Sequence, residues 1–96
     1  MIPDEVTGFD WDEGNIDKNW LLHQVSNSES EEIFFNKPLV ISLARYPELE
    51  ARYFALGITD TGRKLALVYT IRTKKIRIIS ARDMSRKERE VFDAKE

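Results

Sequence analysis

The chain has 96 residues, enough for one hydrophobic core and too few for two, so we expect residues 1–96 to form a single domain. An apolar fraction of 42% and a charged fraction of 33% are typical of a water-soluble protein, and no apolar run is long enough to span a membrane. The chain has no cysteine and one histidine, which excludes disulfide bonds and thiolate metal sites. The acidic N-terminus is unlike a signal peptide, so we expect a cytoplasmic protein.

Charge is distributed unevenly along the chain. Residues 1–62 contain four Lys/Arg and twelve Asp/Glu, whereas residues 63–96 contain eleven Lys/Arg and five Asp/Glu. A net charge of −8 beside one of +6 favours a basic face that binds a polyanion. The alternative is that the two halves neutralise each other through ordinary surface ion pairs.

The first half of the chain predicts a short strand followed by two helices. Residues 8–11 alternate apolar and polar side chains, as a strand does, and Asp12 can cap a helix over residues 13–23. Ile16, Trp20 and His23 have helical spacing on one apolar stripe. Ser26 with Glu29 forms a capping box for a second helix over 27–35, which Pro38 prevents from continuing.

The second half predicts four strands and a last helix. We expect strands over residues 39–44, 52–58, 65–71 and 76–81, with a loop at 45–48 and a tight turn at 59–62 in which Gly62 has a positive φ. Ser85 with Glu88 forms another capping box, which begins the last helix. The predicted fold class is therefore α+β: a four-stranded antiparallel sheet packed by two N-terminal helices and one C-terminal helix.

The hairpin formed by the last two strands has a basic face and an apolar face. An even-numbered loop places Arg72 and Arg77 on one face, with Thr70 between them. Like charges on one sheet face oppose folding unless water or a bound anion screens them. The alternative is a plain solvated face. The opposite face predicts a core, covered by helices that carry Trp20, Phe34 and Val91, and its residues are Leu65, Leu67, Tyr69, Ile71, Ile76 and Ile78.

Further cations follow this hairpin. Arg82 ends the last strand, and Arg86 and Lys87 occupy the first turn of the last helix, where the helix dipole disfavours cations unless a phosphate is bound. His23 is the only side chain that ordinarily titrates near neutral pH, and it is either a core residue or a proton-transfer group. The sequence contains no glycine-rich phosphate loop and no metal-ligand pattern. An enzyme built on it would therefore act on an anion with no cofactor.

These residues resemble the BrnT toxin family in order and spacing. The matching segments are residues 9–12 (FDWD), Asn19 with His23, Val25 and Ser26, Arg52-Tyr53 with Gly57, Tyr69-Thr70, residues 76–82 (IRIISAR) and Glu88-Arg89. The resemblance implies a RelE-like fold and a bacterial ribonuclease that is the toxin of a type II toxin–antitoxin pair. It also implies a BrnA-like antitoxin with a ribbon-helix-helix domain, through which alone the complex would bind operator DNA.

The chain departs from the family pattern in two places. The family commonly has Lys-His-Gly where this chain has Leu22, His23 and Gln24, and a tyrosine where this chain has Phe92. These departures remove a cation beside the histidine and a hydroxyl on the last helix. An alternative is therefore a toxin of weakened activity.

The leading hypothesis is a metal-independent endoribonuclease that cleaves messenger RNA and arrests growth, with the ribosome as a candidate partner. We expect Arg77 and Arg82 to stabilise transition-state charge and His23 to transfer a proton. The expected substrate-binding residues are Arg52, Tyr53, Arg72, Arg86 and Lys87. Two alternatives are a nucleic-acid binder without catalysis and an inactive module that binds the antitoxin. In each case we expect an acidic antitoxin segment to cover the basic hairpin or the last helix.

Overall fold

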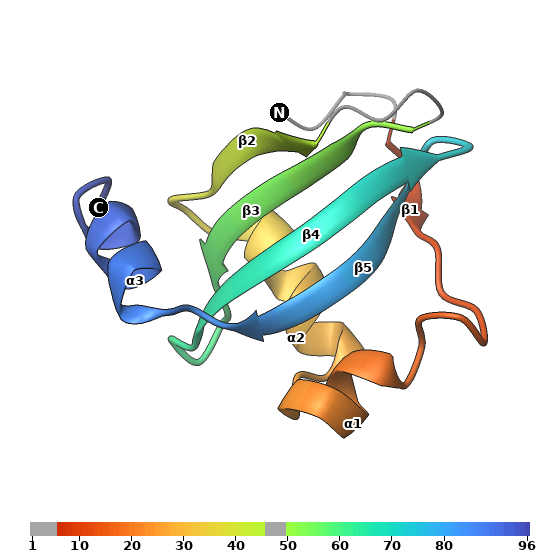
Figure 1. Ribbon diagram of the computed structural model, residues 1–96, viewed down its shortest axis with the longest axis horizontal. Coiled ribbons are helices and arrows are strands. Elements are labelled where there is room, and N and C mark those ends of the chain that lie inside the picture. Colours follow the sequence, from red (N-terminus) through yellow and green to blue (C-terminus); the bar gives the residue numbers. More distant parts are fainter. Residues whose placement is uncertain (1–5, 46–49) are drawn as a thin grey trace.

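The computed structural model describes residues 6–45 and 50–96. One sheet contains five strands in the order β1-β5-β4-β3-β2 (Figure 1). Strands β2 to β5 pair antiparallel, whereas β1 pairs with β5 in parallel. The strands are β1 (Gly8–Phe9), β2 (Val40–Arg45), β3 (Arg52–Ile58), β4 (Lys64–Arg72) and β5 (Lys75–Asp83).

The predicted α+β class is confirmed, but the prediction of four antiparallel strands is wrong at one edge. The short strand at residues 8–9 joins the sheet as a fifth strand, because Gly8 pairs with Lys75 and Phe9 with Ile76. Only these two residues of β1 pair with β5. A segment this short shows alternation in sequence, but it contains nothing that specifies a partner strand so distant in the chain.

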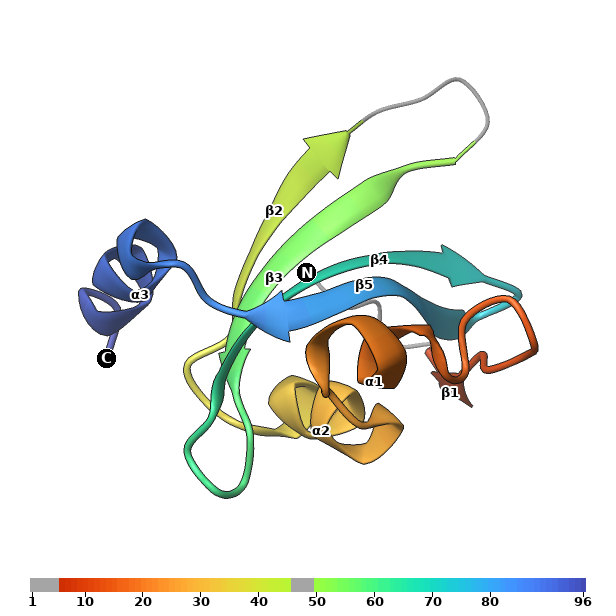
Figure 2. The same cartoon turned by 60° about the horizontal axis from the view of Figure 1, so that its bottom comes forward.

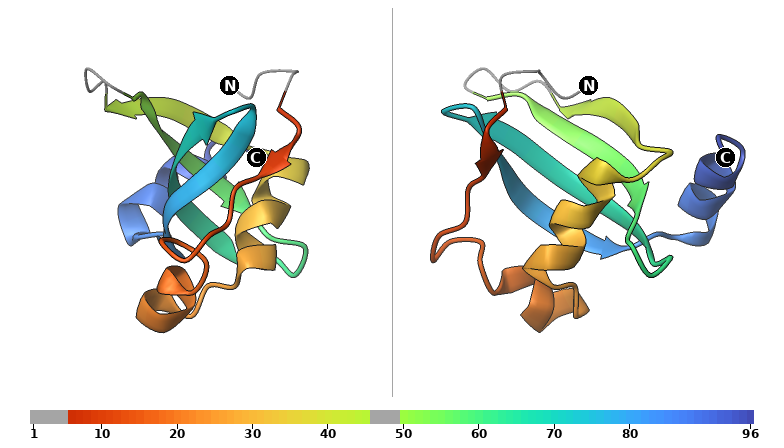
Figure 3. Two further views of the ribbon diagram at one scale, coloured as in Figure 1. Left: turned by 90° about the vertical axis from the view of Figure 1, so that its right-hand side faces the viewer. Right: turned by 180° about the vertical axis from the view of Figure 1, so that it is seen from behind.

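Helices lie on both faces of the sheet. They are α1 (Lys18–His23), α2 (Asn27–Glu32), the 3-10 helix η1 (Ile33–Phe35) and α3 (Arg86–Asp93). Figure 2 shows α1 and α2 beneath the sheet and α3 beyond the end of β5, and the left view of Figure 3 shows α2 and α3 on opposite sides of the sheet. Both predicted capping boxes form, Ser26 with Glu29 at α2 and Ser85 with Glu88 at α3. We find no helix in the described segments that is long and apolar enough to cross a membrane.

The first helix is shorter than predicted, because it begins at Lys18 and residues 13–17 form turns. Asp12 does not cap α1. Its Oδ1 instead accepts the Gly14 N–H at 2.8 Å. The predicted apolar stripe is also wrong: Trp20 is 55% exposed, and Ile16 and His23 are exposed.

The buried side of α1 is polar because it covers an open strand edge. Beyond its two pairs with β1, strand β5 has backbone groups that no neighbouring strand of the described residues satisfies. Asn15 Nδ2 donates to the Ile78 carbonyl at 3.1 Å, and the Ala81 N–H donates to Asn19 Oδ1 at 3.0 Å. Both asparagines are buried. The need to satisfy buried backbone groups therefore outweighs the apolar stripe in setting the orientation of α1.

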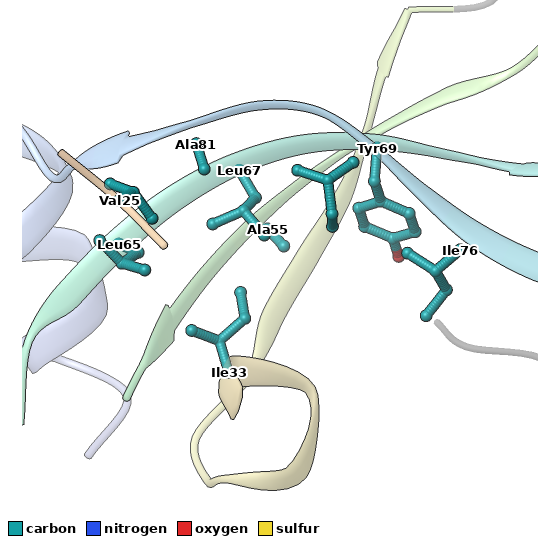
Figure 4. Packing of buried hydrophobic residues seen from close by; sticks show 9 residues of the cluster. Val25, Ile33, Ala55, Leu65, Leu67, Tyr69, Ile76 and Ala81 are labelled. Atoms are coloured by element: carbon teal, nitrogen blue, oxygen red, sulfur yellow. The ribbon is translucent and has the colours of Figure 1, made fainter. Parts of the chain in front are cut away.

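The main core lies between the sheet and the N-terminal helices (Figure 4). Five of the six hairpin residues predicted there are buried, and the sixth, Ile71, is half-buried. Phe34 packs on this cluster as predicted, and its ring meets that of Tyr69 edge-on at 5.2 Å. A Cβ on Gly57 would lie 2.7 Å from Ile33 Cβ, so only glycine lets η1 pack this closely on β3. The buried hairpin residues are Leu65, Leu67, Tyr69, Ile76 and Ile78.

A second, smaller cluster lies on the opposite face of the sheet, under α3. Phe92 is fully buried there, against a group that also contains Leu56, Ala66 and Met84. Val91, which we predicted to cover the main core, is 49% exposed. That prediction is wrong because α3 packs on the other face and turns the neighbouring residue, Phe92, inward.

The hairpin of β4 and β5 contains one extra residue. Val68 pairs with Ser80 and Tyr69 with Ile78, so Ile79 forms a bulge. The turn consists of Thr73 and Lys74, both with positive φ, as a two-residue type I′ turn requires.

The predicted turn at residues 59–62 also forms. Gly62 has a φ of 92° and donates its N–H to the Thr59 carbonyl at 3.0 Å. Most of the predicted loop at 45–48 lies outside the described residues.

Candidate active site

Three arginines from three neighbouring strands converge on one hollow on the sheet face that also carries α3. Arg52 belongs to β3, Arg72 to β4 and Arg77 to β5, and the hollow has a volume of about 180 Å³. Lys18 of α1 and the turn at Gly14 complete the rim. The predicted pairing of Arg72 and Arg77 on one face is thus confirmed, since Arg77 pairs with Thr70, two residues before Arg72. A hollow lined by guanidinium groups suits a phosphate.

Two of these arginines form ion pairs with carboxylates in the free protein. Arg77 donates to both oxygens of Asp12 at 2.9 and 3.0 Å, and Asp10 lies 3.5 Å away. Arg72 donates to Glu50 at 2.8 Å. The hydrogen bond from Arg77 lowers the pKa of Asp12, and the hydrogen bond from Arg72 lowers the pKa of Glu50. Both carboxylates are therefore ionised at neutral pH and hold the guanidinium groups in place.

Gly14 allows this arrangement to close around Arg77. A Cβ at this position would lie 3.1 Å from Arg77 Nη2 and 3.1 Å from Asp12 Oδ1. A larger side chain would therefore crowd the ion pair. The turn that follows β1 consequently brings its backbone directly against the Arg77 guanidinium.

Arg82 lies on the same face at the far end of β5. Arg77 and Arg82 are five residues apart, which would put them on opposite faces of a regular strand, but the Ile79 bulge brings both to one face. Their partners on β4, Thr70 and Ala66, are four residues apart, or about 13 Å along a strand. Arg82 therefore does not line the hollow, and it lies where a neighbouring phosphate of a nucleic acid could bind.

Arg82 also has a carboxylate partner. Its guanidinium donates to both oxygens of Glu88 at 2.7 and 2.9 Å. This pair, together with the Ser85 N–H that caps α3, lowers the pKa of Glu88 to about 2. Glu88 is thus the capping-box acceptor, as its position predicted, and also the anchor of Arg82.

His23 is apart from the arginine hollow. It ends α1 and is exposed, and its carbonyl accepts a 3.4 Å hydrogen bond from Arg63. Arg63 also pairs with Asp83 at 2.7 Å, and the pKa of Asp83 is lowered mainly by this arginine and slightly by the nearby His23. His23 therefore lies nearer the Arg82 end of β5, and it is absent from the lining of the hollow.

The remaining predicted site residues are dispersed. Tyr53 points into the main core, where its ring stacks on Tyr69 at 5.4 Å. Arg86 and Lys87 are exposed on α3.

Sequence reasoning missed Lys18 and the carboxylates that hold the arginines. The FDWD motif contained the signal for two of these carboxylates, Asp10 and Asp12. In residues 6–45 and 50–96 no three His, Cys, Asp or Glu side chains gather closely enough to hold a metal ion.

The chain is thus a small α+β protein with a hollow that is lined by three arginines. Residues 11–88 match the family model for BrnT, the ribonuclease toxin of type II toxin–antitoxin systems, and the chain belongs to this family. The resemblance read from the sequence is confirmed. The protein is accordingly a ribonuclease toxin with RNA as substrate and an antitoxin as partner. No match was found among curated proteins.

Proposed function

We propose that the chain is a metal-independent endoribonuclease that binds the scissile phosphate of RNA in the hollow of Arg52, Arg72 and Arg77. The observation that carries this proposal is the convergence of three guanidinium groups from three strands on one small hollow. Strands are rigid supports, and guanidinium groups stay protonated and bind phosphate oxygens in pairs. They supply positive charge at a phosphate without a metal ion.

The chemistry proceeds by attack of the ribose 2′-hydroxyl on the adjacent phosphorus. The new O–P bond forms as the bond to the 5′-oxygen of the next nucleotide breaks, which leaves a cyclic phosphate. A base takes the 2′ proton, an acid protonates the leaving oxygen, and cations stabilise the charge that develops on the phosphoryl oxygens. Arg77 is the central cation in this proposal, and Arg82 binds a phosphate further along the strand.

Binding of RNA requires an exchange of anions. Asp12 and Glu50 hold Arg77 and Arg72 through the same paired geometry that a phosphate would use. A phosphate that enters the hollow therefore displaces these carboxylates. Substrate binding should consequently weaken with added salt, because the interaction is electrostatic on both sides of the exchange.

We propose proton transfer by His23 only for a scissile phosphate bound at the Arg82 end of β5, because His23 does not line the hollow and a proton-transfer group must lie within hydrogen-bond reach of the reacting atoms. Arg86 and Lys87 are exposed and suit flanking phosphates. Tyr53 faces the core, so we assign it support of the strand that carries Arg52.

We further propose a RelE-like ribonuclease that acts in the cytoplasm on messenger RNA, with the ribosome as a candidate partner. A BrnA-like antitoxin with a ribbon-helix-helix domain would neutralise it, and the complex would bind operator DNA only through that antitoxin.

The test is cleavage of RNA by the purified chain in excess EDTA. We expect cleavage to persist, to fall at least about a hundredfold in Arg77→Ala, and to remain unchanged in Lys37→Ala, a matched loss of an exposed cation away from the hollow. Loss of cleavage on chelation, with recovery when Mg²⁺ is added back, would contradict the proposal.

The distance of His23 from the hollow favours a second candidate, a protein that binds RNA without cutting it. RNA binding that depends on salt and on Arg77, with no cleavage under any condition, would favour this candidate.

A further inference from the structure

The arginine hollow also contains the carboxylate of Glu50 and the ammonium group of Lys18. Both residues belong to its lining, whereas His23 does not. A carboxylate can accept a proton, and an ammonium group can donate one. The hollow therefore holds groups of the two kinds that the cleavage of RNA requires in addition to cations.

These two groups lie on opposite sides of the arginines. Glu50 stands two residues before β3, and Lys18 begins α1, which covers the edge of β5. Strand β4 lies between β3 and β5, so the two sides are two strand spacings apart, or about 10 Å. The attacking and leaving oxygens of a phosphoryl transfer lie roughly in line, one on each side of the phosphorus. A base and an acid for RNA cleavage must therefore flank the phosphate in the same way.

We propose that Glu50 is the general base and Lys18 the general acid of RNA cleavage in this hollow. The assignment rests on the proposed function, because it requires the scissile phosphate to bind among the three arginines. The Glu50 carboxylate accepts the proton of the ribose 2′-hydroxyl as the 2′-oxygen bonds to phosphorus. The electron pair of the breaking P–O bond stays on the leaving 5′-oxygen, which takes a proton from the Lys18 ammonium group. Exchange with water then restores the carboxylate and the ammonium group.

Binding of the phosphate releases Glu50 for this role. In the free protein the Glu50 side chain is 26% exposed and accepts hydrogen bonds from Arg72 at 2.8 and 3.4 Å. A phosphate that takes over the paired donors of Arg72 frees the carboxylate within the hollow. The base is thus held in place before the substrate arrives and becomes available when it binds.

The charges around Glu50 determine how this exchange changes its pKa. The groups that face it from the surrounding elements are Arg72, Arg52, Arg77 and Lys18, with Asp10 and Asp12 beyond Arg77. In the free protein the hydrogen bond from Arg72, together with the charge of the arginines, lowers the pKa of Glu50. A bound phosphate offsets that positive charge and raises the pKa of Glu50 again, which makes the carboxylate a stronger base.

Lys18 is positioned by the bulge of β5. Its Nζ donates to the Ile79 carbonyl at 2.9 Å. An ammonium group has three N–H donors, so two remain for the leaving oxygen and the phosphate. The arginines are poorer proton donors, because a guanidinium group keeps its proton. Lys18 is therefore the better acid among the cations of the hollow.

The pH dependence of RNA cleavage, measured in excess EDTA, tests Glu50. Glu50→Gln should lower kcat about a hundredfold or more and abolish the decline of kcat at acid pH, whereas Glu50→Asp should retain that decline. In the wild type, the decline of kcat should occur at a higher pH than the decline of kcat/KM. The reason is that kcat reports the phosphate-bound complex, and kcat/KM reports the free protein, in which the pKa of Glu50 is lowered.

Asp12→Asn is the matched control, because Asp12 also pairs with an arginine of the site but does not line the hollow. It should change KM and keep the acid decline of kcat. Circular dichroism checks that each variant is folded. Identical pH profiles of the wild type and Glu50→Gln would overturn the assignment of the base, as would loss of the acid decline only in Asp12→Asn.

An RNA with sulfur in place of the leaving 5′-oxygen tests Lys18. A thiolate leaves without being protonated, because a thiol is a much stronger acid than an alcohol. Lys18→Ala should cut ordinary RNA about a hundredfold more slowly but cut the sulfur-containing RNA at close to the wild-type rate, whereas Glu50→Gln should be slow on both. Lys95→Ala, exposed and outside the hollow, should cut both substrates like the wild type.

Equal impairment of Lys18→Ala on the two substrates would overturn its assignment as the acid. Cleavage that depends on Arg77 but is unchanged in Glu50→Gln and Lys18→Ala would overturn the acid–base pair alone. A folded wild-type chain that cuts no RNA would overturn the proposed function and the acid–base pair together.

Discussion

The Arg77 guanidinium is largely covered and is held by Asp10 and Asp12 in the free protein. A cation that is already held in position can stabilise the negative charge of a transition state without a rearrangement of the protein. Removal of such a group typically lowers the rate of catalysis ~10²–10³-fold. We predict that Arg77→Ala and Arg82→Ala each slow RNA cleavage more than His23→Ala does, because His23 does not line the hollow and lacks a cationic neighbour at Leu22. Single-turnover cleavage by the three variants measures this.

Circular dichroism of each variant provides the folding control for that comparison. Arg77→Lys, which keeps the charge but loses the paired geometry, should have an intermediate rate. The assignment is reversed if a folded His23→Ala is inactive beside an Arg77→Ala of near-normal rate. His23 would then be the principal catalyst, and Arg77 an ordinary surface arginine.

Tyr69 has an unusual hydroxyl in the main core. Its side chain is fully buried, and its Oη has no hydrogen-bond partner among the described residues. Burial raises the pKa of Tyr69 to about 12, so the hydroxyl stays neutral. Tyr69→Phe removes a desolvated polar group while keeping the ring contacts with Phe34 and Tyr53. We predict that the free energy of unfolding is unchanged or rises by up to about 1 kcal/mol, measured by denaturant titration. A clear loss of stability would mean that the hydroxyl has a partner.

Among the elements, α1 reverses the usual relation between burial and polarity. Asn19 is buried and accepts the Ala81 N–H, whereas Trp20 beside it is more than half exposed. We predict that Asn19→Ala lowers the free energy of unfolding by about 1–3 kcal/mol, because an edge N–H of β5 loses its acceptor. Trp20→Ala should cost less than about 1 kcal/mol. Thermal or urea unfolding of both variants checks the order, and a larger loss for Trp20→Ala would contradict this account of α1.

The start of α3 should be sensitive to acid. The Arg82 hydrogen bonds, with the Ser85 N–H, lower the pKa of Glu88 from 4.5 to about 2 in the folded protein. A depressed folded-state pKa stabilises the fold above about pH 4.5, and this contribution is lost as pH falls toward 2. We predict that Glu88→Gln costs about 1–2 kcal/mol at neutral pH and that its difference from wild type shrinks over this range.

Unfolding curves between neutral pH and pH 2 measure this difference. Glu90→Gln is the control, because Glu90 is exposed and pairs only loosely with Arg86, at a distance of 3.9 Å. A constant difference between Glu88→Gln and wild type across the acid range would contradict the role of the charge.

For the molecule as a whole, stability comes mainly from the core between the sheet and the N-terminal helices. Ile78 is fully buried in this core. We predict that Ile78→Ala lowers the free energy of unfolding by about 2–4 kcal/mol, through lost transfer energy and a cavity. Leu21→Ala, on an exposed position of α1, should change it by less than about 0.5 kcal/mol. A denaturant midpoint unchanged by Ile78→Ala would contradict the placement of the core.

Much of the fold follows from local patterns in the sequence. Alternation identified the apolar face that includes Leu67 and Ile78, and two capping boxes identified the starts of α2 and α3. Such patterns fail where a residue serves a distant partner. Asn19 turns inward because it bonds to the open edge of β5. Gly8 pairs with Lys75, a residue 67 positions further along the chain.

The candidate site was predictable only in part, for the same reason. The alternation of side chains along the hairpin predicted that Arg72 and Arg77 share one face. The carboxylates that pair with them come from distant segments of the chain. The structure supports the second reading of the charge asymmetry, because acidic residues of the first half, such as Glu29, pair with cations of the second, such as Arg63. Ion pairs between halves cannot be read from local spacing.

The bulge at Ile79 gives β5 one residue more than its pairing with β4 uses. Side chains of a strand alternate between its two faces, and the single extra residue shifts this alternation by one position between Arg77 and Arg82. Loss of Ile79 would remove the bulge and leave Ala81 opposite Leu67 and Arg82 opposite Ala66, so that both side chains would keep their present faces. The bulge is therefore a point at which β5 can lose a residue without exchanging its basic and apolar faces.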